Sequence, residues 1–299
     1  MTATAMHPYT RLPGTPVPMH HWTVDVGLQL AGDSWGDPHG PLVLLLHGVG
    51  QTRHAWRATG RILGAAGYHA VAFDARGHGD SDWAADGDYS RDAMIRDLER
   101  LIAKLEKRPA LVGASMGGAT SLIGVGEGHI DASALILVDI APRTEPSGVA
   151  KVKSFMRDTT NGFRTLEEAA DAIHAYRPRA QQSRMPNGIA KNLRMGADGR
   201  YHWHWDPQLM ARGRESDERR VEAARRLTLP TLLVRGGQSD VVSEEGARDF
   251  LGLCPKAEFV NIAGAGHMVS GDRNDVFGRA ALGFLRRAVP AVREALRQE

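Results

Sequence analysis

The sequence has a single cysteine, Cys254, and almost no excess of charge of either sign. One cysteine excludes an internal disulfide framework and is typical of a reducing compartment, so we expect a cytoplasmic protein. The 37 basic and 35 acidic side chains leave a net charge of +2, which gives no reason to expect a nucleic-acid partner. No stretch approaches the roughly 18 apolar residues of a membrane-spanning helix, so we expect no membrane partner.

The first 19 residues also lack the basic start and the apolar centre of a signal peptide. They are rich in threonine and proline, and we expect a flexible tail there, with order beginning near His20. The 299 residues, of which 42% are hydrophobic, are enough for a large core in one α/β unit that carries an insertion.

Short apolar runs alternate with helical patterns along most of the chain. Alternating polarity around Gly27 predicts a hairpin, and apolar residues at helical spacing predict helices over 51–66, 91–107 and 275–296. Such an order predicts a mostly parallel sheet of about eight strands with helices on both faces. The strands that we expect are 21–26, 28–32, 42–46, 70–74, 111–114, 134–140, 231–236 and 257–262.

The alternation stops between Pro142 and Arg226, where several helix-like segments follow one another without a convincing buried strand. We therefore expect a helical cap inserted over 143–226, between a first part of the core at 20–142 and a second part at 227–299.

The segment from Gly113 to Gly118 has the pattern Gly-x-Ser-x-Gly-Gly and follows an apolar strand. Glycines let two backbones approach closely, so the pattern predicts a sharp strand-to-helix turn with the Ser115 hydroxyl at its tip. Because the pattern is common by chance, its meaning depends on partners elsewhere in the chain.

A serine nucleophile needs a base, and the base needs an acid that holds its tautomer. His267 lies in a glycine-bounded loop after the last strand and is the candidate base. Asp240 follows the strand 231–236 and is the candidate acid, with Asp139, at the end of another strand, as its rival. The oxyanion donors that we expect are the backbone N–H groups of Met116 and Val49.

With these residues in view, the chain resembles an α/β-hydrolase-fold serine hydrolase with a cap domain. The matching segments are His47-Gly48-Val49-Gly50, residues 74–81, residues 113–118, the Asp240 loop and Gly264-Ala265-Gly266-His267. The resemblance implies the α/β-hydrolase fold, an acyl-enzyme on the serine, and a cap that selects the substrate.

Apolar side chains beside the catalytic loops are candidate walls of the substrate pocket. In the segment His202-Trp203-His204-Trp205, alternation puts the two indoles on one side, which favours an aromatic pocket face over a metal site. The candidate wall residues are Trp56, Ile140, Trp203, Trp205, Val241 and Met268.

The sequence thus predicts a hydrolase of a small-to-medium apolar carboxylic ester, lactone or thioester, which needs no cofactor and no metal. Its partner is the small-molecule substrate, and the chain could act as a monomer or as a homodimer. Two alternatives stay open: hydrolysis of a carbon–carbon bond in a vinylogous diketone, and a non-catalytic binding or signalling protein that retains the fold.

Overall fold

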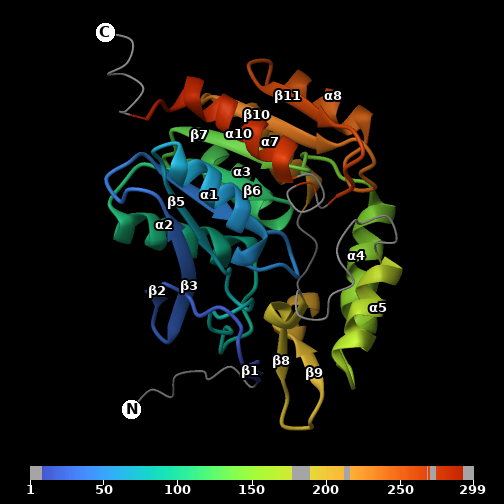
Figure 1. The fold of residues 1–299 in the computed structure, drawn as a ribbon. Coiled ribbons are helices and arrows are strands. Elements are labelled where there is room, and N and C mark those ends of the chain that lie inside the picture. The colour runs from blue at the N-terminus through green and yellow to red at the C-terminus, as the bar shows by residue number, and fades with distance from the viewer. Residues whose placement is uncertain (1–8, 177–188, 212–215, 268, 270–273, 292–299) are drawn as a thin grey trace.

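A mostly parallel sheet forms the centre of the computed structural model, which describes residues 9–176, 189–211, 216–267, 269 and 274–291. Within these residues, eight strands lie in the order β11-β10-β7-β6-β4-β5-β3-β2 (Figure 1). Neighbouring strands from β5 to β11 are parallel, whereas β3 is antiparallel to both β5 and β2. The expected sheet is therefore confirmed. Its strands are β2 (His20–Asp25), β3 (Leu28–Trp35), β4 (Leu42–Leu46), β5 (His69–Phe73), β6 (Ala110–Ala114), β7 (Ala134–Val138), β10 (Thr231–Gly236) and β11 (Glu258–Ile262).

Helices cover both faces of this sheet, because its central strands are apolar on both sides. In β4, Leu44 and Leu46 pack into one core with α2, α3, α7 and α8, whereas Val43 and Leu45 pack into a second core with η1, α1 and α10. The helices that flank the sheet are η1 (Arg53–Trp56), α1 (Arg57–Ala65), α2 (Arg91–Leu105), α3 (Met116–Gly126), α7 (Asp217–Arg225), α8 (Glu244–Leu253) and α10 (Asn274–Ala288).

Local sequence explains where several of these helices begin. Ser90, Ser216 and Ser243 precede α2, α7 and α8, and each hydroxyl accepts a hydrogen bond from the backbone N–H three residues later. Such caps satisfy an amide that the helix itself leaves unpaired. The last helix ends at Ala288, earlier than expected, and the end of its predicted range lies outside the described residues.

The insertion contains short strands beside its helices, whereas the sequence predicts helix-like segments without a convincing buried strand. Strands β8 (Leu193–Met195) and β9 (Tyr201–Trp203) form an antiparallel hairpin, and β1 (Thr10–Arg11) pairs with β8. Three-residue strands are shorter than the roughly four to eight residues over which alternating polarity indicates a strand. The remaining elements of the insertion are α4 (Pro146–Asp158), α5 (Leu166–Tyr176), η2 (Ala190–Asn192) and η3 (Pro207–Ala211).

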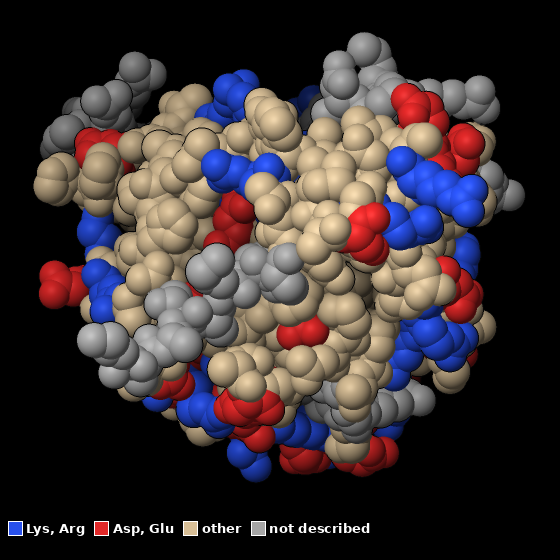
Figure 2. All heavy atoms as spheres, turned by 90° about the horizontal axis from the view of Figure 1, so that it is seen from below, with Lys and Arg blue, Asp and Glu red and all other residues tan. Residues whose placement is uncertain are grey.

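Because β1 pairs with the hairpin, residues 10 and 11 belong to the folded molecule and not to a free tail. In Figure 1 the pair α4–α5 lies at the right of the main sheet, and the small sheet lies at the bottom of the molecule. Seen from that side, acidic and basic side chains are interspersed around the edge of the molecule (Figure 2). None of the described helices has both the length and the apolar character needed to cross a membrane.

Candidate active site

Ser115 is the single residue between β6 and α3, at the sharp turn that the sequence predicts. Its backbone has φ of 46° and ψ of −108°, a left-handed conformation that costs free energy in a residue with a side chain. The amide of Ser115 donates to the carbonyl of Val138 on the neighbouring strand, and that of Gly117 donates to the carbonyl of His47. These contacts fix the turn, so the strained serine stays half-buried at its tip, where it lines the cavity.

Two glycines make this turn possible. A Cβ on Gly113 would lie 2.6 Å from the carbonyl carbon of Gly117, and a Cβ on Gly117 would lie 2.5 Å from the Cβ of Leu46. Both distances are shorter than real Cβ contacts, so β6, the start of α3 and β4 reach this separation only without side chains at 113 and 117.

His267 pairs with Asp139. The Nδ1 atom of His267 lies 2.7 Å from Oδ2 of Asp139, whose side chain is completely buried. Asp139 follows β7 with a φ of 48°, and its amide donates to the carbonyl of Val234 on β10. This turn directs the carboxylate at the imidazole, the arrangement that holds a histidine in one tautomer.

The loop after β10 supplies two more donors to the same carboxylate. The amide of Gly236 donates to Oδ1 at 2.8 Å, and the hydroxyl of Ser239 donates to Oδ2 at 2.5 Å. Ser239 in turn accepts hydrogen bonds from the amides of Val241 and Val242. Three donors therefore surround the buried carboxylate and compensate for its removal from water.

Asp240, the acid favoured by the sequence, does not contact His267, so that prediction is wrong and its rival Asp139 takes the position. The side chain of Asp240 is 46% exposed and pairs with Lys151 of α4 at 3.0 Å. Since Ser239 faces Asp139, the next side chain points the other way, towards the insertion. Asp139 and Asp240 follow neighbouring strands, and they have different contacts because the loop after β10 turns the side chain of Asp240 away from His267.

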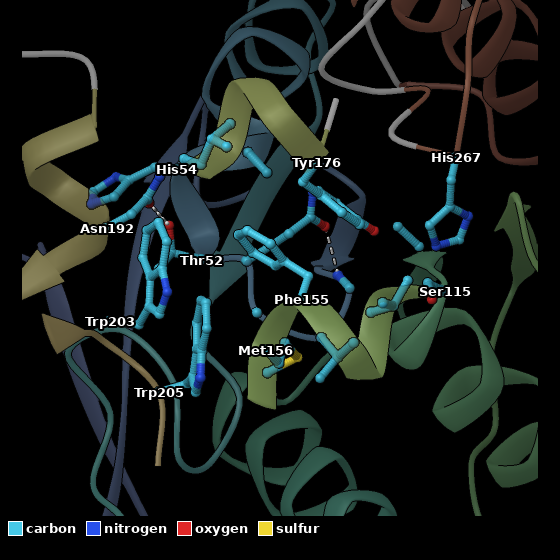
Figure 3. A pocket seen from close by; sticks show the side chains of 18 of the residues that line it. Thr52, His54, Ser115, Phe155, Met156, Tyr176, Asn192, Trp203, Trp205 and His267 are labelled. Atoms are coloured by element: carbon cyan, nitrogen blue, oxygen red, sulfur yellow. Dashed lines mark hydrogen bonds between the residues drawn. The ribbon is translucent and has the colours of Figure 1, made fainter. Parts of the chain in front are cut away.

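Ser115 and His267 line the same cavity, and Figure 3 shows the imidazole above the serine side chain. Beside them, the N–H of Met116 is the first of α3 and so has no acceptor within the helix. Val49 lies between two residues whose amides are engaged: Gly48 donates to Oε1 of Gln51 at 2.9 Å, and Gly50 donates to Nε2 of His78 at 3.2 Å.

Two buried histidines shape the loop that carries Val49. Nε2 of His47 accepts from the amide of Ala75, while its Nδ1 lies 2.8 Å from the carbonyl of Gly48. His78 uses its Nδ1 in the same way, 3.0 Å from the carbonyl of Arg76, which leaves Nε2 to accept from Gly50. Both networks need neutral rings, and burial lowers the pKa of His47.

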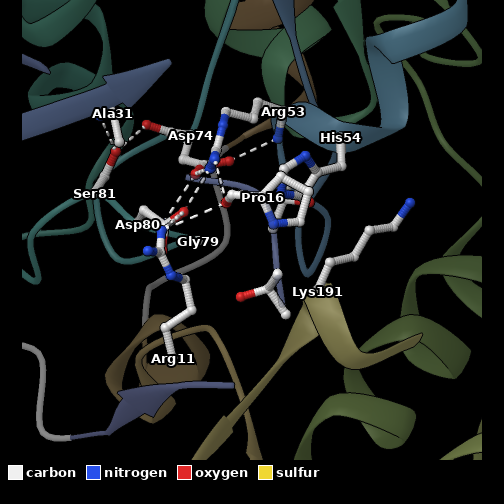
Figure 4. Close-up of polar contacts among 12 residues, drawn as sticks. Arg11, Pro16, Ala31, Arg53, His54, Asp74, Gly79, Asp80, Ser81 and Lys191 are labelled. Carbon is white, nitrogen blue, oxygen red and sulfur yellow. Dashed lines mark hydrogen bonds and ion pairs between the residues drawn. The ribbon is translucent and has the colours of Figure 1, made fainter. Parts of the chain in front are cut away.

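Residues 74–81 form a hydrogen-bonded clasp around a buried arginine. Arg53 contacts Asp74 at 2.5 Å and Asp80 at 2.9 Å, and the Ser81 hydroxyl donates to the carbonyl of Asp74 (Figure 4). Arg76 closes the other side through two hydrogen bonds to Asp97. The clasp holds His78 in place, and with it the Val49 loop.

The cavity has two lobes that meet at Ser115. The first has a volume of about 190 Å³ and the second of about 160 Å³. Val152 and Met156 of α4 contribute to both lobes, so this helix lies where they meet. The first lobe is mainly aromatic (Figure 3) and the second mainly aliphatic. Prominent side chains are Phe155, Tyr176, Trp203 and Trp205 in the first, and Met116, Ile140, Val149, Leu209, Met210 and Val241 in the second.

Most candidate wall residues therefore line the cavity, but Trp56 does not. It is fully buried in the second core, where its ring lies 5.8 Å from that of Phe277 on α10. The helical turn η1 carries it to the far face of the sheet. Met268 lies outside the described residues. Trp203 and Trp205 stack at 4.9 Å, while His204 accepts from the amide of Gly79 on their other side.

Sequence reasoning missed the side chains that α4 and α5 bring to the cavity. Val152, Phe155 and Met156 follow Val149 at helical spacing, a signal for one apolar face of a helix. That signal does not reveal whether the face covers a core or a cavity. Ser239 was also missed, because a serine in a turn usually bonds only to nearby backbone, as this one also does.

Comparisons with known proteins agree with this fold. The family described as the alpha/beta hydrolase fold matches residues 41–273. A 3-hydroxybutyrate-oligomer hydrolase of Cupriavidus necator is 29% identical over 260 residues, which cover 80% of this chain and 87% of that protein. An esterase of Mycobacterium tuberculosis is 27% identical over 250 residues, 80% of each chain. The crystal structure of E-2-(acetamidomethylene)succinate hydrolase has a TM-score of 0.77 at 21% identity and covers 89% of this chain and 98% of its own.

Proposed function

The chain belongs to the alpha/beta hydrolase fold family and is a hydrolase, and from that premise we propose that it cleaves a carboxylic ester through an acyl-enzyme on Ser115. The observation that carries the proposal is the junction of three features in one cavity: the strained Ser115 at its turn, the imidazole of His267, and the buried carboxylate of Asp139 behind that imidazole. A lactone or a thioester would react in the same way.

The reaction begins with proton transfer from Ser115. Because Nδ1 of His267 is engaged by Asp139, the free Nε2 is the atom that removes the proton from the serine hydroxyl. The serine oxygen then forms a bond to the ester carbonyl carbon, and the carbonyl oxygen becomes negatively charged. Asp139 keeps its charge throughout and stabilises the imidazolium.

The amides of Met116 and Val49 supply the donors for that charged oxygen. Each such donor typically stabilises the transition state by about 3 kcal/mol. Collapse of the intermediate breaks the bond to the alcohol, which leaves with the proton from Nε2. Water then attacks the acyl-enzyme with His267 as base, and the acid and free Ser115 are released.

The two lobes suit the two halves of an ester, since the scissile bond would lie where they meet, at Ser115. One lobe holds the acyl part and the other the leaving alcohol. The apolar walls of both lobes favour carbon-rich substituents.

A fluorophosphonate probe and p-nitrophenyl acetate test this proposal. We expect the probe to label Ser115 and the ester to be hydrolysed, while Ser115→Ala abolishes both and Ser147→Ala, at an exposed position of α4, preserves both. Absence of labelling and turnover in the wild type would instead favour a binding protein. Release of a ketone in place of an alcohol, from vinylogous diketones only, would favour carbon–carbon bond hydrolysis.

A further inference from the structure

The charged side chains that line the cavity all have one sign. Among the described residues, neither lobe is lined by an aspartate or a glutamate. Basic side chains line both, namely Lys191 in the first and Arg91, Lys153 and Arg220 in the second. A cleft lined by one sign of charge favours ligands of the other.

The two arginines of the second lobe have structural contacts. Arg91 donates to the carbonyl of Met116 and to the hydroxyl of Thr120, and Arg220 donates to the carbonyl of Pro142. These bonds tie α2 and α7 to the catalytic turn and to the loop after β7. These contacts account for both guanidinium groups, so neither group needs a ligand as its partner.

Lys191 has no such explanation. It lies on η2, is half-buried, and forms no ion pair with any carboxylate in the part of the chain that the structure describes. The contacts drawn in Figure 4 gather on Arg53, Asp74 and Asp80, and none reaches Lys191. Burial, and then the charge of Arg57, lower the pKa of Lys191, as expected for an ammonium group with no anionic partner.

The side chains that line the cavity beside Lys191 are polar and uncharged. Burial, and then the neighbouring Arg53, lower the pKa of His54 to about 4, so this ring is neutral at pH 7. The charge of Lys191 also contributes to that shift, which indicates that the two groups are close. Thr52 and Asn192 lie beside them, 3.4 Å apart between Oγ1 and Oδ1.

This polar end of the first lobe lies opposite the reacting end. In Figure 3, His54, Thr52 and Asn192 are on one side of the lobe and Ser115 and His267 are on the other. Aromatic side chains of the insertion line the lobe between these two ends. The lobe therefore has a positively charged end, an apolar middle and a reactive end.

We propose that the first lobe binds a substrate arm that ends in a carboxylate, with Lys191 as its ion-pair partner and Thr52 and Asn192 as further polar contacts. This inference rests on the proposed function, because it names the class of ester: a monoester of a dicarboxylic acid, or an ester with a free acid at the far end of an aliphatic chain. The carboxylate compensates the half-buried ammonium, and the methylene groups contact the aromatic walls.

Paired substrates test the carboxylate directly. Mono-p-nitrophenyl esters from glutarate to suberate are compared with neutral esters in which a methyl group replaces the far carboxylate, such as p-nitrophenyl hexanoate for the adipate. We expect the best acid to exceed its neutral partner in kcat/KM by roughly 10- to 100-fold, the usual effect of one charged contact. Lys191→Met should remove that advantage through KM and leave the neutral ester within about twofold, while Lys104→Met, on the exposed side of α2, changes neither.

A binding measurement separates this inference from the proposed catalysis. Calorimetry on Ser115→Ala with monomethyl adipate and methyl hexanoate should detect the preference for the acid, and Lys191→Met in that background should abolish it. Equal binding of the two esters, or equal losses for both on Lys191→Met, would overturn the carboxylate site even if Ser115 reacts with the probe. If the acid is still preferred in the binding measurement but the wild type hydrolyses no ester, only the catalytic proposal is overturned.

Discussion

Asp139 and Asp240 follow adjacent parallel strands, yet their surroundings are opposite. Asp139 is fully buried and accepts hydrogen bonds from His267, Gly236 and Ser239. Asp240 is half-exposed and forms an ion pair with Lys151 on α4. The carboxyl ends of neighbouring strands meet at one edge of a sheet, so both residues are near the site. The path of the loop, and not the strand, therefore decides which carboxylate supports the histidine.

The largest effect is expected when the buried aspartate is neutralised. Asp139→Asn keeps the shape of the side chain but removes its negative charge and replaces one acceptor oxygen with an NH2 donor. The wrong tautomer of His267 is then favoured, so we expect kcat to fall by about 10³–10⁴-fold. Steady-state kinetics with a p-nitrophenyl ester measure the effect. Labelling of Ser115 by the fluorophosphonate probe should slow in parallel, and unchanged kinetics would refute the role of Asp139.

The loop of Asp240 packs against α4, and a substitution on α4 tests this contact. A Cβ on Gly148 would lie 2.0 Å from the carbonyl oxygen of Asp240, so α4 packs directly on that loop. Gly148→Ala should displace α4 and destabilise the fold by about 1–3 kcal/mol, as overpacking typically does. Urea unfolding measures the change. Because α4 carries Val152 and Met156, KM should rise more than kcat falls, whereas a variant with wild-type stability would contradict this packing.

Ser239 belongs to the loop of Asp240, but its hydroxyl donates a hydrogen bond to Asp139. We expect Ser239→Ala to lower kcat roughly tenfold with little change in KM, since the carboxylate loses one of three donors. Ser239→Thr retains the hydroxyl and should recover most of the activity. If the threonine variant were as slow as the alanine variant, the hydroxyl would not be the group that matters.

The smallest effect is expected at Asp240 itself. Asp240→Asn removes an exposed ion pair, which typically contributes less than about 1 kcal/mol to the free energy of unfolding. Activity should stay within about threefold of the wild type. High salt should screen the same ion pair, so the difference in stability between the two proteins should shrink as salt is added.

The sequence predicts the parts of the fold that have strong local signals. The all-apolar run of β4 marks a strand buried on both faces, and the glycines at 113 and 117 mark the turn at Ser115. The hairpin β8–β9 leaves no comparable trace, because its strands are short and one partner, β1, is far away in the sequence.

In the site, too, some residues have a strong local sequence signal and others have none. Ser115 and His267 were found because chain order and flanking glycines identify them, although their catalytic roles stay predictions. The path of one loop decides which of the two aspartates contacts His267. The helical turn η1 decides that Trp56 faces the other core. Local sequence predicts neither the path of the loop nor the orientation of Trp56, because each results from packing against distant segments.

Proton NMR of the His267 ring tests most directly which carboxylate holds the imidazole. A ring N–H that is hydrogen-bonded to a carboxylate gives a resonance far downfield of the amide region, so His267→Asn identifies the signal by its loss. We predict that the resonance persists in Asp240→Asn and disappears in Asp139→Asn. A resonance that survives in Asp139→Asn and disappears in Asp240→Asn would contradict the account.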